Sequence, residues 1–308
     1  MSRIDLTSLH GTNPAGFLAA LGVLSACDRA GLDVRLGWTS GLVPHAFVEG
    51  ADIGDLDALA EVLMADVAHP VHNVLLGFTP SGAHQPIDDL KPSVAEISEW
   101  AAMVQSLWDL PAAQRFSSVL AEGAIARTTN DSKPTALHFT SGQQKFVQMA
   151  AEVRGQMALA ACVNALSGRW VPDESSRSMR WNNALGRAPY ALAAVAPGKG
   201  TPPGVRGIEW LAVAGLGLTA VARHGHGLAT QGSAQSWNDG AWRWPIWSAA
   251  LRPRTARAVI GHPQFVGEGT QPSQQAMASL GVTRVLEAPI RRPSKYGEFG
   301  PTRTIASV

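Results

Sequence analysis

The sequence contains only two cysteines and no long apolar run, and these shortages exclude two classes of protein. Cys27 and Cys162 are too few for a disulfide framework or a cysteine-rich zinc module, and they fit a reducing compartment. The longest apolar runs, 17–27 and 210–222, are shorter than the roughly 20 residues that span a membrane. We therefore expect a cytoplasmic protein with no membrane partner.

The first apolar run also has features of a leader sequence. Residues 24–27 (Leu-Ser-Ala-Cys) are similar to a lipoprotein cleavage site. However, Asn13 and Pro14 are typical of a helix start, with asparagine as the cap and proline in the first turn. We interpret 14–30 as a buried helix rather than a leader.

Catalytic signatures are absent as well. The sequence has no Gly-x-Ser-x-Gly elbow, no His-Glu-x-x-His helix, no Cys-x-x-Cys pair and no complete phosphate-binding loop. The run 198–201 (Gly-Lys-Gly-Thr) resembles the end of such a loop, but glycine follows its lysine where serine or threonine is required. These absences predict a protein that is not an enzyme and holds no cofactor and no metal.

Two pairs of histidines leave one enzymatic alternative open. His224 with His226, and His69 with His72, are close in sequence, and imidazole nitrogen is a common ligand of divalent metals. A metal site requires three or four ligands, and neither pair has an obvious third member. The enzymatic alternative is a metal-dependent hydrolase that uses His224 and His226.

The protein also has little net charge. Its formal value is only +1, but this value is the sum of two halves of opposite sign. Residues 1–125 carry 15 acids and five bases, whereas residues 126–308 carry 20 bases and nine acids. Arginine outnumbers lysine 20 to five, and a guanidinium can bind phosphate through a two-point fork. Either the halves neutralise each other, across an interface or in an oligomer, or the basic half binds a polyanion.

Basic and aromatic residues are interleaved in the second half, as in proteins that bind nucleic acid. Arginines surround Trp181 and Tyr190, Arg243 lies between two tryptophans, and three bases adjoin Tyr296. Packing in the core is the ordinary role of tryptophan, and we expect it for most of these rings. The candidate nucleic-acid-binding residues are Arg177, Arg180, Arg187, Lys199, Arg252, Arg254, Arg257, Arg291, Arg292, Lys295, Gln143 and Lys145.

Hydrophobic spacing predicts a mixed α/β or α+β fold, in which an acidic, helix-rich first half lies on a few strands. The expected division is an acidic region 1–125 and a basic Arg/Trp-rich region 126–308, or one intertwined domain. In the first half we expect strands at 4–9, 34–38 and 42–48, the last two as a hairpin, and helices at 14–30, 55–67, 94–107 and 112–120.

The basic half is expected to combine strands with a long helix. Apolar residues keep helical spacing from 143 to 166, so Gln143 and Lys145 would lie at a helix start, where backbone N–H groups can bind an anion. Gln143 could equally cap the chain turn there. We also expect strands at 136–140, 242–247 and 282–290, a loop at 172–207, and helices at 207–223, 253–260 and 273–280.

Three stretches of the sequence form a recognisable set. The first is 9–24, Leu-His-Gly-Thr-Asn-Pro-Ala-Gly-Phe-Leu-Ala-Ala-Leu-Gly-Val-Leu, and the second is 139–146, Phe-Thr-Ser-Gly-Gln-Gln-Lys-Phe. The third joins 180–192 to 207–212 and is similar to a pattern of Arg-Trp-Asp, Arg-x-Tyr-Ala-Leu and Leu-Ala, with Asn182 in place of the aspartate. Together they resemble subunits of type I-U (I-G) CRISPR systems.

The resemblance implies a subunit of a crRNA-guided surveillance complex (Cascade) in antiviral defence, similar to a reduced large subunit. Such a protein would contact crRNA and target DNA, dock its acidic half on other effector subunits, and leave cleavage to a recruited helicase-nuclease. The leading hypothesis is a non-catalytic DNA- and RNA-binding subunit that contributes to recognition of the target or its adjacent motif. The alternative is a structural protein-interaction subunit without direct nucleic-acid contact.

Overall fold

Helices and antiparallel sheets alternate irregularly along the chain. The computed structural model describes residues 2–107, 134–184, 203–224, 227–233, 240–266, 271–292 and 296–308. Within them the predicted mixed α/β fold class is confirmed, with helices and several small antiparallel sheets.

A three-stranded antiparallel sheet begins the fold, in the order β1 (Ser2–His10), β3 (His45–Gly50) and β2 (Val34–Trp38). The hairpin predicted from the two alternating runs is confirmed, with Leu36 opposite Val48, although β3 begins at His45 rather than at residue 42. Ile4 and Leu6 of β1 are buried while the residues between and beside them are exposed, so that face of the strand packs on the core.

Local capping explains where the helices of the first half begin. The side chain of Asn13 accepts a hydrogen bond from the N–H of Ala15, as expected, and Asp55 accepts one from Ala58. Ser93 and Glu96 form a reciprocal capping box. These helices are α1 (Pro14–Arg29), α2 (Leu56–Val67), η1 (Pro70–His72), α3 (Asn73–Leu76) and α4 (Val94–Ser106); the helix predicted at 112–120 lies outside the described residues.

A second sheet is centred on β9 (Val282–Arg291), which pairs with β8 (Ala241–Trp247) on one edge and with β10 (Glu298–Phe299) and β11 (Arg303–Ser307) on the other. The predicted strands at 242–247 and 282–290 are therefore confirmed. The remaining elements of this half are α6 (Phe146–Gly155), α7 (Leu159–Ser167), β4 (Asp173–Arg177), β5 (Pro203–Gly204), α8 (Arg206–Gly215), η4 (Leu216–Leu218), β6 (Val221–His224), β7 (Gly227–Thr230), α9 (Pro253–Ile260), α10 (Pro263–Val266) and α11 (Gln274–Ser279).

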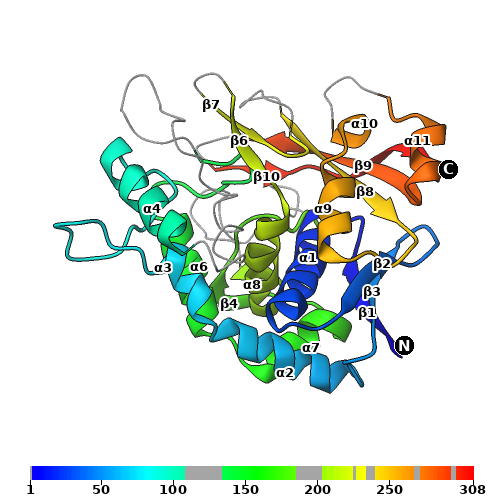
Figure 1. Cartoon of the computed structure of the whole chain (residues 1–308), viewed down its shortest axis with the longest axis horizontal. Coiled ribbons are helices and arrows are strands. Elements are labelled where there is room, and N and C mark those ends of the chain that lie inside the picture. The colour runs from blue at the N-terminus through cyan, green and yellow to red at the C-terminus, as the bar shows by residue number, and fades with distance from the viewer. Residues whose placement is uncertain are drawn as a thin grey trace, which may run out of the picture.

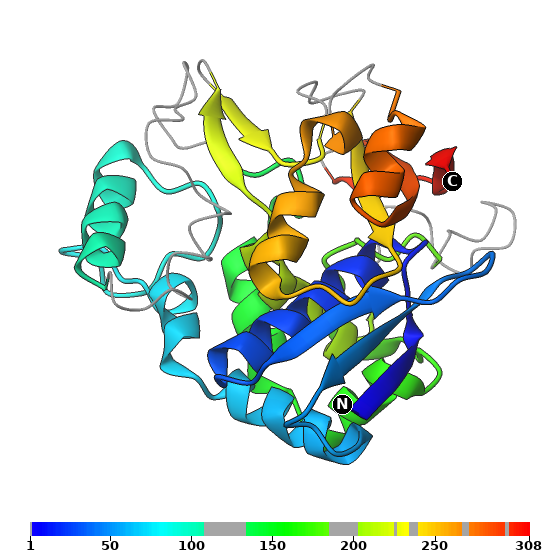
Figure 2. The same cartoon turned by 45° about the vertical axis from the view of Figure 1, so that its right-hand side comes forward.

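Helices α1 and α8 pack side by side at the centre of the molecule (Figure 1). Phe17 of α1 contacts Trp38 of the first sheet and three tryptophans of β8, with ring centroids 5.5 to 6.1 Å apart. One cluster of buried apolar residues runs from Ile4 to Phe299, so side chains from both sides of residue 125 share a core. By contrast, α4 buries only Ile97 and Trp100 fully and stands at the edge of the molecule, on the left in Figures 1 and 2.

The long helix predicted at 143–166 is wrong, because the chain forms two helices there. Helix α6 ends at Gly155 and α7 begins at Leu159, and each buries its own apolar face. The segment between them is held by Arg206, whose guanidinium donates to the carbonyl of Gln156. Helical spacing is preserved across the break, which is why the sequence pattern did not reveal it.

Three further element predictions need correction. The loop predicted at 172–207 contains the paired strands β4 and β5. Residues 136–140 do not form a strand; their carbonyl groups instead accept hydrogen bonds from Trp181, Arg292 and the N–H of Gly297. The helix predicted at 207–223 ends at Gly215, and the chain continues through η4 into β6. Among the described residues, every helix is too short or too polar to span a lipid bilayer.

Candidate nucleic-acid interface

The most exposed of the predicted basic clusters lies on α9. Arg254 and Arg257 are three residues apart, so they lie on one face of the helix, and both are exposed. The opposite face buries Ala256 and Val259 against the core. The helix contains no acidic residue, and neither arginine forms an ion pair with any described residue.

Arg252 precedes α9 and is partly neutralised. Its guanidinium lies 2.7 Å from the carboxylate of Asp33, and both side chains are about half exposed. An exposed pair of this kind contributes little to stability and can be displaced by a stronger anion. The α9 cluster, defined as Arg252, Arg254 and Arg257, therefore presents two unpaired guanidinium groups and one that is weakly paired.

The second predicted cluster is divided between surface and interior. Arg291 is exposed at the end of β9, and Lys295 lies outside the described residues. Arg292 turns inward, where it donates to the carbonyl oxygens of His138 and Ala136 at 3.2 and 3.0 Å and lies over the ring of Phe139. Burial lowers the pKa of Arg292 to about 10. This arginine holds the 136–139 segment in place.

Arg177 and Arg180 also have partners within the chain. Arg177 lies 3.5 Å from the carboxylate of Glu152. Arg180 is 9% exposed, stacks its guanidinium over the ring of Tyr296 at 4.3 Å, and donates to the side chain of Gln144 at 3.4 Å. Arg187 and Lys199 lie outside the described residues.

The start of α6 is already occupied by an acid of the first half. The N–H of Phe146 donates to the carboxylate of Asp89 at 3.1 Å, and Lys145 lies 3.4 Å from Asp88. Burial raises the pKa of Asp89, but the hydrogen bond from His138 and those from the backbone outweigh it and leave the pKa below its usual value. Among the residues predicted at this helix start, Gln143 is exposed and Lys145 is partly exposed.

The three sequence stretches 9–24, 139–146 and 180–212 meet in space. The side-chain amide of Asn13 donates to Asn182 at 2.7 Å, which joins the first stretch to the third. Gln144 and Arg180 join the second stretch to the third. These contacts lie next to the buried Trp181, whose indole N–H donates to the carbonyl of Leu137. These residues thus form a structural junction that is buried or partly buried.

The tryptophans beside the predicted arginines are core residues. Trp181, Trp242 and Trp244 have no measurable exposure, so their rings cannot stack on nucleic-acid bases in this structure. The expectation that most of these rings pack in the core is confirmed. Tyr296 is partly exposed but stacks on Arg180, and Tyr190 lies outside the described residues.

The sequence did not draw attention to Glu209, a buried carboxyl in α8. Its oxygens accept hydrogen bonds from the hydroxyl of Ser178 and the N–H of Met179, and no cation among the described residues pairs with it. Burial raises the pKa of Glu209 to about 7. These bonds hold the turn before Arg180, which is the one non-glycine residue of the described chain with a positive φ, at 67°. The sequence signal that could have identified Glu209 is a single acid in the otherwise apolar run 207–215.

Replacing Glu209 by glutamine is expected to stabilise the protein in alkaline but not in acidic solution. The folded-state pKa lies above the unfolded value of 4.5, so the carboxyl favours folding below pH 4.5, and that contribution is lost as the pH rises to about 7. Glutamine keeps an acceptor oxygen and cannot ionise. At pH 8, urea denaturation should show a gain of about 2 to 3 kcal/mol over the wild type, with no gain near pH 4.

The matched control for this prediction is Glu61→Gln, on the exposed side of α2. That change should alter stability by less than about 0.5 kcal/mol at either pH. A Glu209→Gln gain that is the same at pH 4 and pH 8 would show that ionisation of the buried carboxyl is not the cause.

Of the two histidine pairs, His69 and His72 do not form a metal site with other described residues. His72 is fully buried and bonds to Asp66, and no group of three or more histidine, cysteine or acidic side chains suited to a metal occurs among the described residues. His226 lies outside them, and the side chain of His224 is not described. The hydrolase alternative at His224 and His226 thus stays a prediction. No protein-family model matches this sequence, and no curated protein matches it either.

Proposed function

We propose that this protein is a non-catalytic subunit of a crRNA-guided CRISPR effector complex of type I-U (I-G), in which the α9 cluster binds nucleic-acid phosphates. The observation that carries the nucleic-acid part is the pair of exposed, unpaired guanidinium groups of Arg254 and Arg257 on a helix without acids. Two guanidinium groups on one helix face suit the regularly spaced phosphates of a duplex.

The assignment to an effector complex rests on the resemblance of 9–24, 139–146 and 180–212. The hydrogen bonds between Asn13 and Asn182 and between Gln144 and Arg180 support it, because they join the three separate stretches in one part of the fold. In this proposal the α9 cluster positions target DNA or crRNA without reading its sequence, and base pairing between RNA and DNA supplies specificity. Other effector subunits, and a helicase-nuclease for cleavage, would be the partners.

The double variant Arg254→Ala/Arg257→Ala is expected to weaken binding to duplex DNA at least tenfold near 0.1 M salt. Loss of two phosphate contacts should also reduce the slope of log affinity against log salt concentration by about 1.8. Fluorescence anisotropy with a labelled duplex over a salt series measures both quantities, in the free protein and in the assembled complex.

The matched control removes two exposed arginines elsewhere, Arg3 on β1 and Arg169 after α7. This Arg3→Ala/Arg169→Ala variant has the same net charge as the test variant. Equal losses in both variants would mean that binding follows total charge and not the α9 cluster. Binding that is insensitive to salt would contradict the proposal and favour the alternative of a structural protein-interaction subunit.

A further inference from the structure

A cavity of about 410 Å³ opens between α4, the preceding loop and the start of α6. This volume is typical of a site for a small molecule or for one long side chain. Its apolar wall consists of Ile87 and three prolines, Pro80, Pro86 and Pro92. Proline has no backbone N–H group to donate and has a fixed φ, so this wall is stiff and offers rings rather than hydrogen-bond donors.

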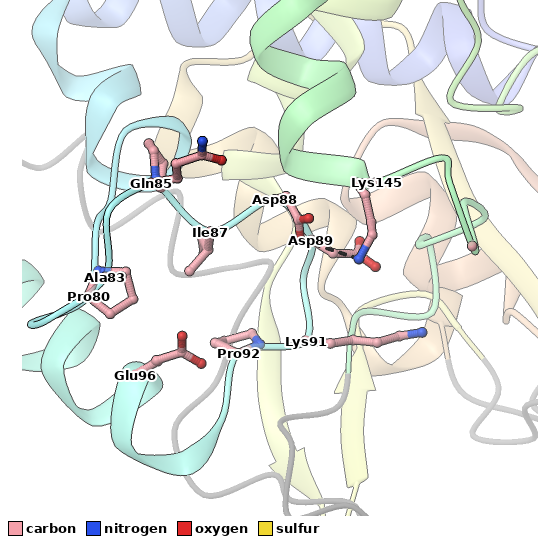
Figure 3. Close-up of a pocket in the computed structure, with 12 residues that line it drawn as sticks. Pro80, Ala83, Gln85, Ile87, Asp88, Asp89, Lys91, Pro92, Glu96 and Lys145 are labelled. Carbon is pink, nitrogen blue, oxygen red and sulfur yellow. Dashed lines mark hydrogen bonds and ion pairs between the residues drawn. The ribbon is translucent and has the colours of Figure 1, made fainter.

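Most of the charges that line this cavity have partners within the chain. Asp89 accepts hydrogen bonds from His138 and from the N–H of Phe146, and Asp88 pairs with Lys145. Figure 3 shows the ammonium of Lys145 beside these acids, on the opposite side of the cavity from Pro80. These groups form the rim of the cavity and do not require a ligand.

Glu96 is different, because its carboxylate is fixed but has no cation. One oxygen accepts hydrogen bonds from the N–H and the hydroxyl of Ser93, both at 2.7 Å. No cation among the described residues pairs with Glu96. Figure 3 shows the carboxylate directed between Pro80, Ile87 and Pro92, while Lys91 extends away from it.

A second fixed carboxylate lies on the same helix, although it is not one of the residues that line the cavity. Glu99, one turn further along α4, accepts the N–H of Ser81 at 2.7 Å and so ties the loop to the helix. Its charge is likewise not balanced by an ion pair with a described residue. The ligand that suits this site is a cation on an aliphatic stem: the stem would contact Ile87 and the prolines, and the cation would meet Glu96.

We propose that this cavity, the Glu96 pocket, binds an arginine side chain of a basic protein partner. A guanidinium can form two parallel hydrogen bonds with a carboxylate, is more weakly hydrated than an ammonium, and stacks on flat surfaces. This site lies in the acidic half of the chain and does not depend on nucleic-acid binding by the α9 cluster. It provides a specific contact through which the acidic half can dock on a basic neighbour.

The test uses N-acetyl-arginine N-methylamide as the probe and the δ1-methyl NMR signal of Ile87 as the reporter. The probe should shift this signal, whereas its neutral isostere, the citrulline derivative, should not. Glu96→Gln should weaken binding about tenfold, since a hydrogen bond to a charged group is lost. Glutamine preserves the capping box at Ser93, so α4 should still begin at the same residue, which circular dichroism checks.

Glu61→Gln, which removes an exposed acid from α2, is the control for nonspecific attraction and should leave the affinity unchanged. The proposal is overturned if the Ile87 signal does not respond to the arginine probe, if citrulline binds equally well, or if both glutamine variants lose the same affinity. A lysine derivative that binds as tightly as arginine would overturn the choice of arginine. Since DNA binding is measured separately, failure here leaves the α9 proposal untouched.

Discussion

Substituting alanine for Gly22 is expected to lower the free energy of unfolding by about 4 kcal/mol, among the largest effects of any single methyl group in this protein. A Cβ at this position would overlap the carbonyl oxygen of Leu211 in α8. Gly215 of α8 faces the same crossing, where a Cβ would overlap the carbonyl oxygen of Leu18. Main-chain atoms cannot turn aside as a side chain can, so α1 and α8 would have to separate at the centre of the core.

Gly155→Ala provides the control, because Gly155 is also helical but a Cβ there would have no neighbour within 4 Å. In that position alanine should stabilise the helix by up to about 1 kcal/mol, since it restricts the unfolded chain. Urea denaturation of the two variants gives both changes in the free energy of unfolding, provided that its dependence on urea concentration (the m-value) is the same in both. If Gly22→Ala loses less than about 1 kcal/mol, the helices do not cross as closely as described.

This crossing also joins two of the three stretches on which the proposed CRISPR assignment rests. Gly22 belongs to the first stretch and Leu211 to the third, and they meet where α1 packs on α8. Asn13 and Asn182 connect the same two stretches at the start of α1. These contacts assemble the core, so the stretches behind the proposed assignment do not by themselves identify a surface that contacts a ligand.

The parts of the fold that the sequence predicted are those determined locally. Asn13 caps α1 because its side chain reaches an N–H two residues away, and the 34–48 hairpin forms between adjacent runs. The errors at 136–140 and 143–166 arise from distant residues. Trp181 and Arg292 take the carbonyl groups that a strand would use, and Arg206 holds the break between α6 and α7.

In the candidate site, too, some features depend on local spacing and others on residues that are distant in sequence. The sequence named Arg254 and Arg257 as candidates and predicted the helix that carries them, and in that helix a spacing of three residues places both on one exposed face. Spacing could not show that Arg180 and Arg292 turn inward, because their partners, Tyr296 and the 136–139 segment, are more than 100 residues away in sequence. For the same reason, no sequence pattern identified Asp89 as the acid that occupies the start of α6.

Replacing Asp66 by asparagine is expected to destabilise the protein by about 3 to 5 kcal/mol, because it breaks a buried ion pair and leaves a cation behind. Asp66 receives two hydrogen bonds from the guanidinium of Arg29, at 2.5 and 2.7 Å, and one from His72 at 3.2 Å. The side chains of Arg29, Asp66 and His72 are at most 5% exposed. This network joins α1, α2 and η1, so its loss would loosen three elements at once.

Asp5→Asn is the matched control, since Asp5 pairs with Arg3 on the surface, where both side chains are nearly half exposed. An exposed pair contributes at most about 1 kcal/mol, and so the control should remain near wild-type stability. Thermal and urea denaturation would measure both variants. A loss of the same size in both would mean that burial does not strengthen the Asp66 network.

The Asp66 network also affects how the stability of the fold changes as the pH falls. Burial raises the pKa of Asp66, but the hydrogen bonds and charges of Arg29 and His72 outweigh it and hold the pKa well below its usual range. Asp66 therefore stabilises the fold above its unfolded pKa of 3.8, and this contribution is lost as the pH falls below that value. Burial lowers the pKa of His72, so stability is also lost as the pH falls below 6.5.

The two groups act in the same direction, so their joint contribution to stability should decline from pH 6.5 downward and fall more steeply below pH 4. Asp66→Asn removes the contribution of Asp66 below pH 4, which gives a flatter curve at lower overall stability. The histidine step and the contributions of other carboxylates with a lowered pKa, such as Asp89, remain. Glu209 has the opposite sign, because its raised pKa favours folding in acid. Measuring the free energy of unfolding of Asp66→Asn and Glu209→Gln from pH 3 to pH 8 would separate the opposing contributions. If the dependence on pH below pH 4 is the same in Asp66→Asn as in the wild type, the assignment to this carboxylate is wrong.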